Sequence, residues 1–512
     1  MPPRAALAVP ALLVLVGAAV AWLIVGAGFA NYDTAYALVW GSDLAHGRRP
    51  DYTVPIAPTP HPLSNLLGLV LAPLGKGAET AWVVLGFGFL GALGAATYAL
   101  GAHWFGRAAG LLAAAIILTR EPVLSFGVRA YIDVPYLVLV LLAVLSEARR
   151  SRAGLPVLVA LALAGLLRPE AWLFSAGYLV WLALGRDRTP RQLTTLALVA
   201  ASAPLIWMVA DLLVTGNPLH SLVGTRANAE VLERRTGLSA VPLTAPRRLG
   251  EILREPVLLG AALGGLLSLG LLRERAALGA AAGIAAMLAF GVLAAAGLPI
   301  LGRYLLLPAT LLAIFCAGAV FGWRYLPPGA WRRRWQAAAA ITVLALLAFA
   351  PAQVGRLDRL RHNMQAQAAI LGDLRALSQQ PAFATGCRPV GVPNHRLVPH
   401  LALWLDERPA FLVSAQLGGW IAASTSSPPR GGSSGCSRSI PTIRAASPRP
   451  CRRASRGSRT TLHGCSTSRA EAAHASRLRK RRKWTVHPPS KLISGRVRRS
   501  KAPVELPRNA CR

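Results

Sequence analysis

NYDTAYALVWGSDLAHGRRPDYTVPIAPTPHPLSNL, residues 31–66, is the stretch from which the rest of the chain is interpreted. It follows an apolar run, residues 7–29, that is long enough to cross a bilayer as a helix. Asp33 lies a few residues beyond that run and therefore near the membrane surface. A membrane enzyme can place a base there against a lipid-borne substrate. An ordinary solvated loop fits the same residues, since charge clusters usually face water.

Composition indicates a multi-pass membrane protein. Of the 512 residues, 54% are hydrophobic and only 15% are charged, which is too apolar for one soluble domain. The formal net charge of +35 would suggest nucleic-acid binding in a soluble chain. However, the segment from Arg430 onward holds 22 Lys and Arg against 2 Asp and Glu, and much of the remaining charge lies in short loops. No nucleic-acid partner is expected, and the cysteines show neither metal-ligand spacing nor a disulfide framework.

The apolar runs predict an all-α membrane protein with about eleven transmembrane helices. Some runs are shorter than the roughly 20 residues of a full crossing. The first run is interpreted as an uncleaved helix, because no small-residue cleavage site precedes Asn31 convincingly. The predicted spans are 7–29, 79–101, 108–120, 132–148, 155–167, 170–185, 192–214, 256–272, 276–297, 303–325 and 336–352.

Arginine placement predicts the orientation. Tight basic groups such as Arg149 with Arg150 and Arg332 to Arg334 fall in alternate loops, which the positive-inside rule places in the cytoplasm. This predicts a plasma-membrane protein whose site faces the extracytoplasmic side. The outward set is then 30–78, 121–131, 168–169, 215–255, 298–302 and everything after 352.

Several arginines nevertheless lie in the outward set. Arg168 and Arg303 occupy very short turns at span ends, and Arg129 and Arg226 lie in longer segments. The planar guanidinium matches phosphate, so these four residues are candidates to bind the phosphate of a lipid-linked donor. The alternatives are simple tolerance of charge in translocated loops and snorkelling of Arg303 to the headgroups.

Acids accompany these arginines. An acid at membrane depth is costly unless it faces protein, water or a partner, which makes Asp133 in RAYIDVPY a candidate second acid beside Asp43. Helix N-capping explains Asp133 as well. Glu170 in LLRPEAW fits simple helix initiation behind Pro169 as well as a supporting role. The remaining supporting candidates are His61 and Tyr304.

Two segments lie outside the predicted transmembrane domain, residues 1–352. Residues 353–425 predict a small outer α/β domain, with a helix at about 356–378 and strands in RPVGVPN and RPAFLVSA; it would engage the acceptor or serve as a cap. Residues 426–512, rich in Ser, Pro and Arg, predict a disordered basic tail. A polybasic arm that binds anionic lipid would explain the tail. We also hypothesise a reading-frame slip, since a shifted frame in a GC-rich gene yields this composition.

The order of these motifs resembles the GT-C superfamily of membrane glycosyltransferases, and most closely its protein O-mannosyltransferase and aminoarabinose-transferase branch in an actinobacterial style. The resemblance covers most of residues 1–352. It implies transfer of mannose or a similar sugar, with inversion, from a polyprenyl-phosphate donor to a hydroxyl of an envelope glycan, lipid or protein. By resemblance Asp33 is the catalytic acid of the first outer loop, Asp133 the second recurrent acid, and Arg303 the arginine that opens a late span. The family usually has Asp-Glu where this chain has Asp33-Thr34.

Two functions compete at this point. Besides the glycosyltransferase, a transporter or flippase of lipid-linked sugars would also need many spans and outward arginines. Transporters place ionisable residues near the bilayer midplane and often carry internal repeats. Here the acids cluster at outer helix ends and no repeat is visible, which favours the enzyme. No cofactor is expected, and no residue spacing compels a metal.

Overall fold

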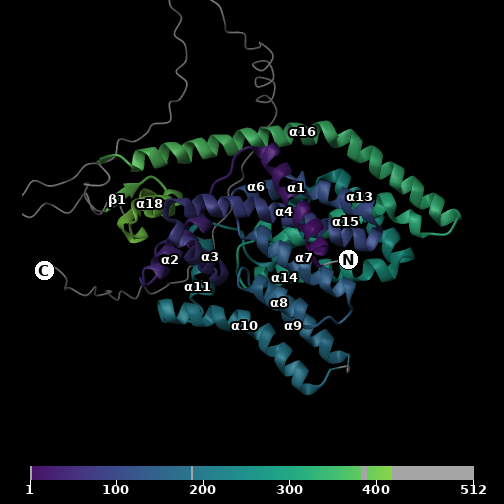
Figure 1. Cartoon of the computed structure of the whole chain (residues 1–512), viewed down its shortest axis with the longest axis horizontal. Coiled ribbons are helices and arrows are strands. Elements are labelled where there is room, and N and C mark those ends of the chain that lie inside the picture. Colours follow the sequence, from purple (N-terminus) through teal and green to yellow (C-terminus); the bar gives the residue numbers. More distant parts are fainter. Residues whose placement is uncertain (1–2, 186–187, 382–388, 418–512) are drawn as a thin grey trace, which may run out of the picture. The chain divides into compact units, whose positions relative to one another are not determined.

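The computed structural model describes residues 3–185, 188–381 and 389–417, which fold mainly as helices (Figure 1). Six segments of this described part are long and apolar enough to cross a membrane. They contain α1 (Pro3–Val25), α3 (Pro62–Leu71) with η1 (Ala72–Gly77) and α4 (Ala78–Phe105), α10 (Pro190–Thr215), α14 (Arg273–Ala295), η3 (Gly302–Leu305) with α15 (Leu306–Phe321) and η4 (Gly322–Tyr325), and α16 (Ala330–Ser378).

Two bent helix pairs raise this number to eight if each pair is one span. The first pair, α5 (Arg107–Leu118) and α6 (Glu121–Val128), bends by 69°. The second joins η2 (Leu238–Ala240) and α12 (Val241–Leu253) to α13 (Glu255–Leu271) and bends by 107°. The chain is therefore a multi-pass membrane protein, as its composition predicted.

The expected number of about eleven spans is not confirmed. Every predicted span falls on a helix, but three of these helices belong to none of the candidate spans or bent pairs and are short: α7 (Asp133–Arg149), α8 (Leu155–Gly165) and α9 (Glu170–Leu184). At a rise of about 1.5 Å per residue they are about 26, 17 and 23 Å long. A bilayer core is roughly 30 Å thick, so length alone does not qualify them as full crossings.

Small residues let the helices approach closely. A Cβ added at Gly91 in α4 would lie 1.9 Å from the carbonyl oxygen of Val14 in α1, so only glycine fits this crossing. At the centre of the bundle, 89% of the apolar window in Gly302–Tyr325 is buried by other helices. This buried segment carries Arg303 at its start, which places a charge at the edge of the helical core.

The stretch that follows the first span is not a loop. Residues 30–78 form α2 (Tyr32–Ala45) before α3, and most of α2 is buried. Its Gly41 lies against Gly68 of α3, where an added Cβ would meet the Gly68 backbone at 2.2 Å. An ordinary solvated loop is therefore wrong for this stretch. Residues 215–255 form three further short elements, α11 (His220–Val231), η2 and α12.

Beyond the last predicted span, the chain continues as helix. The expected helix at about 356–378 is the end of α16, so the expected domain boundary after residue 352 falls inside one continuous helix (Figure 1). The two expected strands form as β1 (Val390–Val392) and β2 (Leu412–Ser414), which pair in parallel. Between them lies α18 (Val398–Leu405), which packs against α2. The predicted tail, residues 426–512, lies outside the described residues.

Candidate active site

Asp33 is placed by the N-terminus of α2. The side chain of Asn31 caps this helix and accepts hydrogen bonds from the backbone N–H of Asp33 at 2.7 Å and of Thr34 at 3.3 Å. Asn31 in turn donates its side-chain amide to the carbonyl of Arg129 at 2.8 Å. Asp33 therefore stands in the first turn of a helix whose start is tied to the segment after α6.

Thr34 stands where the resembling family usually has the glutamate of its Asp-Glu pair, and its contacts are structural. Its side chain is fully buried and donates a hydrogen bond to the carbonyl of Ala130 at 2.7 Å. Asn31 donates a second bond to the Thr34 hydroxyl. Thr34 therefore anchors the helix start, and Asp33 is the acid of this pair that reaches the charged cluster described next.

Arg303 connects two acids that are distant in sequence. Its Nη1 lies 3.1 Å from Oδ2 of Asp33 and 3.6 Å from Oδ2 of Asp133. Asp133 is buried in the first turn of α7, but it does not cap that helix: the N-cap is Ile132, and no side chain bonds to the free N–H groups there. Capping alone is therefore wrong for Asp133. Arginine side chains pair with this buried carboxylate, which would be costly to bury at membrane depth without a partner.

Arg168 extends the chain of ion pairs. It donates through Nη1 to Asp133 and through Nη2 to Glu170, while its Nε lies 3.2 Å from Oε1 of Glu170. Its guanidinium also lies 4.0 Å from the ring centroid of Tyr304 and 5.3 Å from that of Tyr136. Glu170 does begin α9, as the helix-initiation alternative states, but it is also buried against Arg168.

These contacts define one charged network. It alternates acid and base in the order Asp33, Arg303, Asp133, Arg168 and Glu170. With every group ionised the network holds three negative and two positive charges, a net charge of −1. The arginines predicted to bind phosphate are thus held by carboxylates. An incoming anion can bind these arginines only if its oxygens replace the carboxylate oxygens as hydrogen-bond acceptors.

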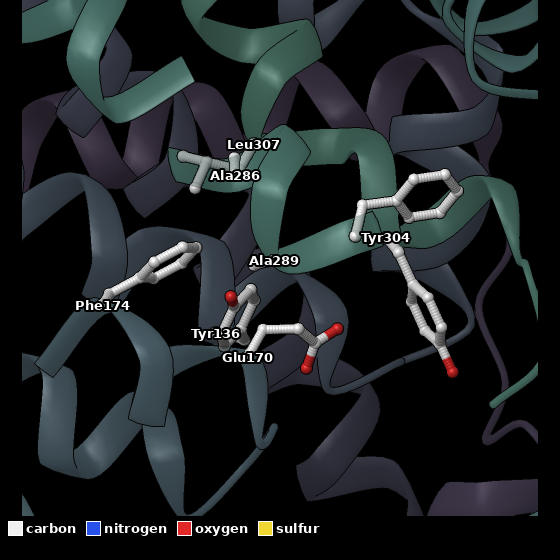
Figure 2. A pocket seen from close by; sticks show the side chains of 8 residues that line it. Tyr136, Glu170, Phe174, Ala286, Ala289, Tyr304 and Leu307 are labelled. Atoms are coloured by element: carbon white, nitrogen blue, oxygen red, sulfur yellow. The ribbon is translucent and has the colours of Figure 1, made fainter. Parts of the chain in front are cut away.

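A small pocket lies at the Glu170 end of the network. Figure 2 shows the carboxylate of Glu170 between the rings of Tyr136 and Tyr304, with Phe174 nearby. The pocket has a volume of about 10 Å³, which is about the space of one water molecule. This end of the network is therefore closely packed, whereas Asp33 and Arg303 at the other end remain 19% and 21% exposed.

Arg129 borders the network through an aromatic ring. Its guanidinium lies 5.2 Å from the ring centroid of Tyr131, and that of Arg303 lies 5.6 Å from the same ring. The ring thus contacts both cations. Sequence reasoning missed Tyr131 and Tyr136, although both occur in the RAYIDVPY motif that identified Asp133.

His61 also lies near these charges. Its Nδ1 is buried without a hydrogen-bond partner among the described residues, and its ring packs edge-on against Trp207 at 5.5 Å. Burial, together with the positive charges of Arg303 and Arg168, lowers the pKa of His61 to about 3. His61 is therefore neutral at physiological pH and does not add a positive charge to the site.

Two predicted site residues lie elsewhere. Asp43 stands at the other end of α2 and pairs with Arg48 at 2.9 Å. Ten residues of helix carry it about 15 Å from Asp33. Arg226 is exposed on α11 and donates to the carbonyl of Ala296 at 2.7 Å. Among the described residues, no hydrogen bond or ion pair joins either side chain to the network, so the structure does not bring them to it and their predicted roles stay predictions.

Comparison with known proteins gives a structural neighbour. No protein-family model matches the chain, and no curated protein matches its sequence. The structure is similar to the crystal structure of ArnT from Cupriavidus metallidurans bound to undecaprenyl phosphate, with a TM-score of 0.51 and 15% sequence identity. The match covers 80% of this chain and 87% of that one. The fold is GT-C-like. At this identity the likeness concerns the fold, and the GT-C-like fold is what the order of sequence motifs predicted.

The GT-C-like scaffold and the network together define what the site offers chemically. It holds a partly exposed carboxylate, Asp33, beside a guanidinium that a second acid also holds. Such a pair supplies a proton acceptor and an anion-binding group within one hydrogen-bond length of each other. Among the described residues, no group of three or more His, Cys, Asp or Glu side chains is placed to hold a metal ion.

Proposed function

We propose that the chain is a membrane glycosyltransferase that transfers a sugar such as mannose, with inversion, from a polyprenyl-phosphate donor to an acceptor hydroxyl. The acceptor is an envelope glycan, lipid or protein, and the reaction takes place on the outer face of the plasma membrane. The observation that carries the proposal is the ion pair between Asp33 and Arg303 at 3.1 Å in a GT-C-like fold. The similarity to a structure with bound undecaprenyl phosphate supports the choice of donor.

Asp33 is the base in this proposal. The acceptor oxygen attacks the anomeric carbon, Asp33 takes the hydroxyl proton, and the bond between the anomeric carbon and the phosphate oxygen breaks. The electron pair of that bond leaves with the polyprenyl phosphate. Attack from the face opposite the leaving group inverts the anomeric configuration.

Arg303 is the group that receives the phosphate. The bound donor is a phosphodiester with one negative charge, and the departing phosphate monoester carries about −1.5 to −2 at pH 7. A guanidinium beside the phosphate therefore binds the transition state more tightly than the donor. When Arg303 moves toward the phosphate, it also releases Asp33, whose carboxylate is then free to act as the base.

Arg168 has a different role in this scheme. Its side chain is 6% exposed and two acids hold it, so it orients Asp133 and through it Arg303. We therefore assign donor phosphate binding to Arg303 first, with Arg129 next to it across Tyr131. The scheme uses no metal, so excess EDTA should leave transfer unchanged.

The test is consumption of a lipid-linked sugar by the purified full-length protein. Asp33→Asn should abolish transfer while donor binding persists. Asp358→Asn, which alters an exposed acid on α16, should leave transfer unchanged and serves as the control. Near-normal turnover by the Asp33→Asn protein would overturn the assignment of the base. Movement of intact donor across vesicle membranes without transfer would instead identify the transporter or flippase.

A further inference from the structure

A second cavity lies at the end of α2 opposite to Asp33. It has a volume of about 190 Å³. α2 forms one wall, and the residues that end and follow α18 form the other. The lining residues are Val39, Ser42, Asp43, Arg48, Ala402, Leu403, Asp406, Glu407, Arg408 and Phe411.

The polar groups of this cavity pair with one another. Asp43 is 6% exposed, and its Oδ1 accepts a hydrogen bond from Nε of Arg48 at 2.9 Å. Arg48 also reaches Oδ1 of Asp406 at 3.5 Å, across the cavity from α2. The guanidinium of Arg48 thus connects the two walls of the cavity. Planar carboxylate and guanidinium groups held in this way bind adjacent hydroxyls through paired hydrogen bonds.

The cavity also has an apolar face. The side chain of Phe411 is 45% exposed although it is large and hydrophobic, and Val39 and Leu403 contribute further apolar surface. A sugar ring likewise combines an apolar face of C–H groups with hydroxyls at its edge, so it can contact both parts of the lining. An exposed aromatic ring beside hydrogen-bonding polar groups is therefore suited to a carbohydrate.

The charge of the lining argues against other ligands. Asp43, Asp406 and Glu407 stand beside Arg48 and Arg408, which gives the lining a formal charge of −1. Arg48 lies between Asp43 and Asp406, where it takes the place that a divalent cation would need. A lipid tail would leave these charges without water. A neutral ligand rich in hydroxyls meets none of these objections.

We propose that this cavity binds a neutral carbohydrate segment of the acceptor, some distance from the hydroxyl that is glycosylated. The inference rests on the proposed function and adds the chemical class of the acceptor. Asp33 and Asp43 lie ten residues apart on one helix, a rise of about 15 Å. A glycan that fills the cavity can therefore place another of its sugars at Asp33 only if it is several units long. Single sugars should occupy the cavity without being good acceptors.

The test measures binding and transfer separately on the full-length protein in detergent. The binding probes are neutral mannose and glucose oligosaccharides of one to five units, observed by saturation-transfer NMR. Longer oligosaccharides should bind to the wild-type protein. Arg48→Gln and Phe411→Ala should each weaken this binding at least tenfold and raise the acceptor KM, with donor affinity unchanged. Phe411→Ala alters an exposed side chain and keeps the test valid if Arg48→Gln misfolds. The matched control is Arg247→Gln, since Arg247 is exposed on α12 and its ion pair within the described part of the chain is with Glu251.

The outcomes separate this inference from the proposed function. Oligosaccharide binding that both variants weaken, in a protein without transferase activity, would support the cavity and refute the glycosyltransferase. Transfer activity with an acceptor KM that neither variant changes would overturn the carbohydrate site and leave the transferase standing. Failure of every neutral oligosaccharide to bind, or preference for an acidic glycan or a peptide, would also overturn it.

Discussion

Arg303 stands between Asp33 and Asp133, 3.1 Å from the first carboxylate and 3.6 Å from the second. Three helical segments that are distant in sequence meet at this guanidinium: the start of α2, the start of α7 and η3. Without Arg303, two acids would face each other at the end of a helical bundle, where like charges repel and hydration is reduced. Arg303 thus both stabilises the arrangement and is the cation nearest the proposed base.

Replacing Arg303 tests its role in donor binding. Arg303→Gln should weaken donor binding by about 1.5–3 kcal/mol, the scale of a lost hydrogen bond to a charged group, which is roughly a ten- to 150-fold change in Kd. Titration of the donor into purified protein measures this directly. Arg247→Gln should leave donor Kd unchanged. Unchanged donor affinity together with lower stability would support the snorkelling alternative for Arg303.

The buried pair of Asp133 and Arg168 predicts strong coupling. Their side chains are 1% and 6% exposed, so removal of one partner leaves the other charge buried without its counterion. Asp133→Asn or Arg168→Gln alone should each destabilise the protein by about 3–5 kcal/mol. The double variant should lose clearly less than the sum of the two, and denaturation in a double-mutant cycle measures the difference. Strict additivity would show that the two groups do not act as a pair.

The anchoring of α2 predicts a kinetic effect without loss of a catalytic group. Asn31→Ala removes an N-cap worth about 1 kcal/mol, and Thr34→Val leaves the carbonyl of Ala130 without its partner. Both changes should let Asp33 move, so kcat should fall more than KM changes. Thr194→Val is the control, because this exposed threonine bonds only within its own helix. If all three variants lowered kcat equally, Asn31 and Thr34 would not be positioning residues for Asp33.

Much of this arrangement was accessible from the sequence, and the failures have physical causes. Charges at span ends are costly, so Asp133, Arg168 and Arg303 could be selected one by one. Their mutual pairing depends on tertiary packing, which hydropathy does not report. Asp43 was grouped with Asp33 because the two are near in sequence, whereas α2 separates them by about 15 Å. The N-cap pattern of Asn31 was readable in advance but was overlooked, because residues 30–78 were interpreted as a loop.

His400 predicts how stability depends on pH. This residue of α18 is 5% exposed, its Nδ1 has no hydrogen-bond partner among the described residues, and burial lowers its pKa to about 4. In the unfolded chain a histidine has a pKa of about 6.5, so between these two values the unfolded state binds more protons. Stability should therefore fall as the pH is lowered from about 6.5 to about 4, and it should be insensitive to this group above that range.

Removal of the titrating group tests that prediction. His400→Leu should flatten the fall of thermal stability between pH 6.5 and 4, whereas His362→Gln, at an exposed histidine on α16, should leave the wild-type slope unchanged. Thermal unfolding of each purified variant across this pH range gives the comparison. His61, whose pKa burial also lowers, should contribute a smaller slope that remains in the His400→Leu protein. A slope as steep as that of the wild type in this variant would show that His400 does not cause the fall, and would place the pH sensitivity elsewhere in the chain.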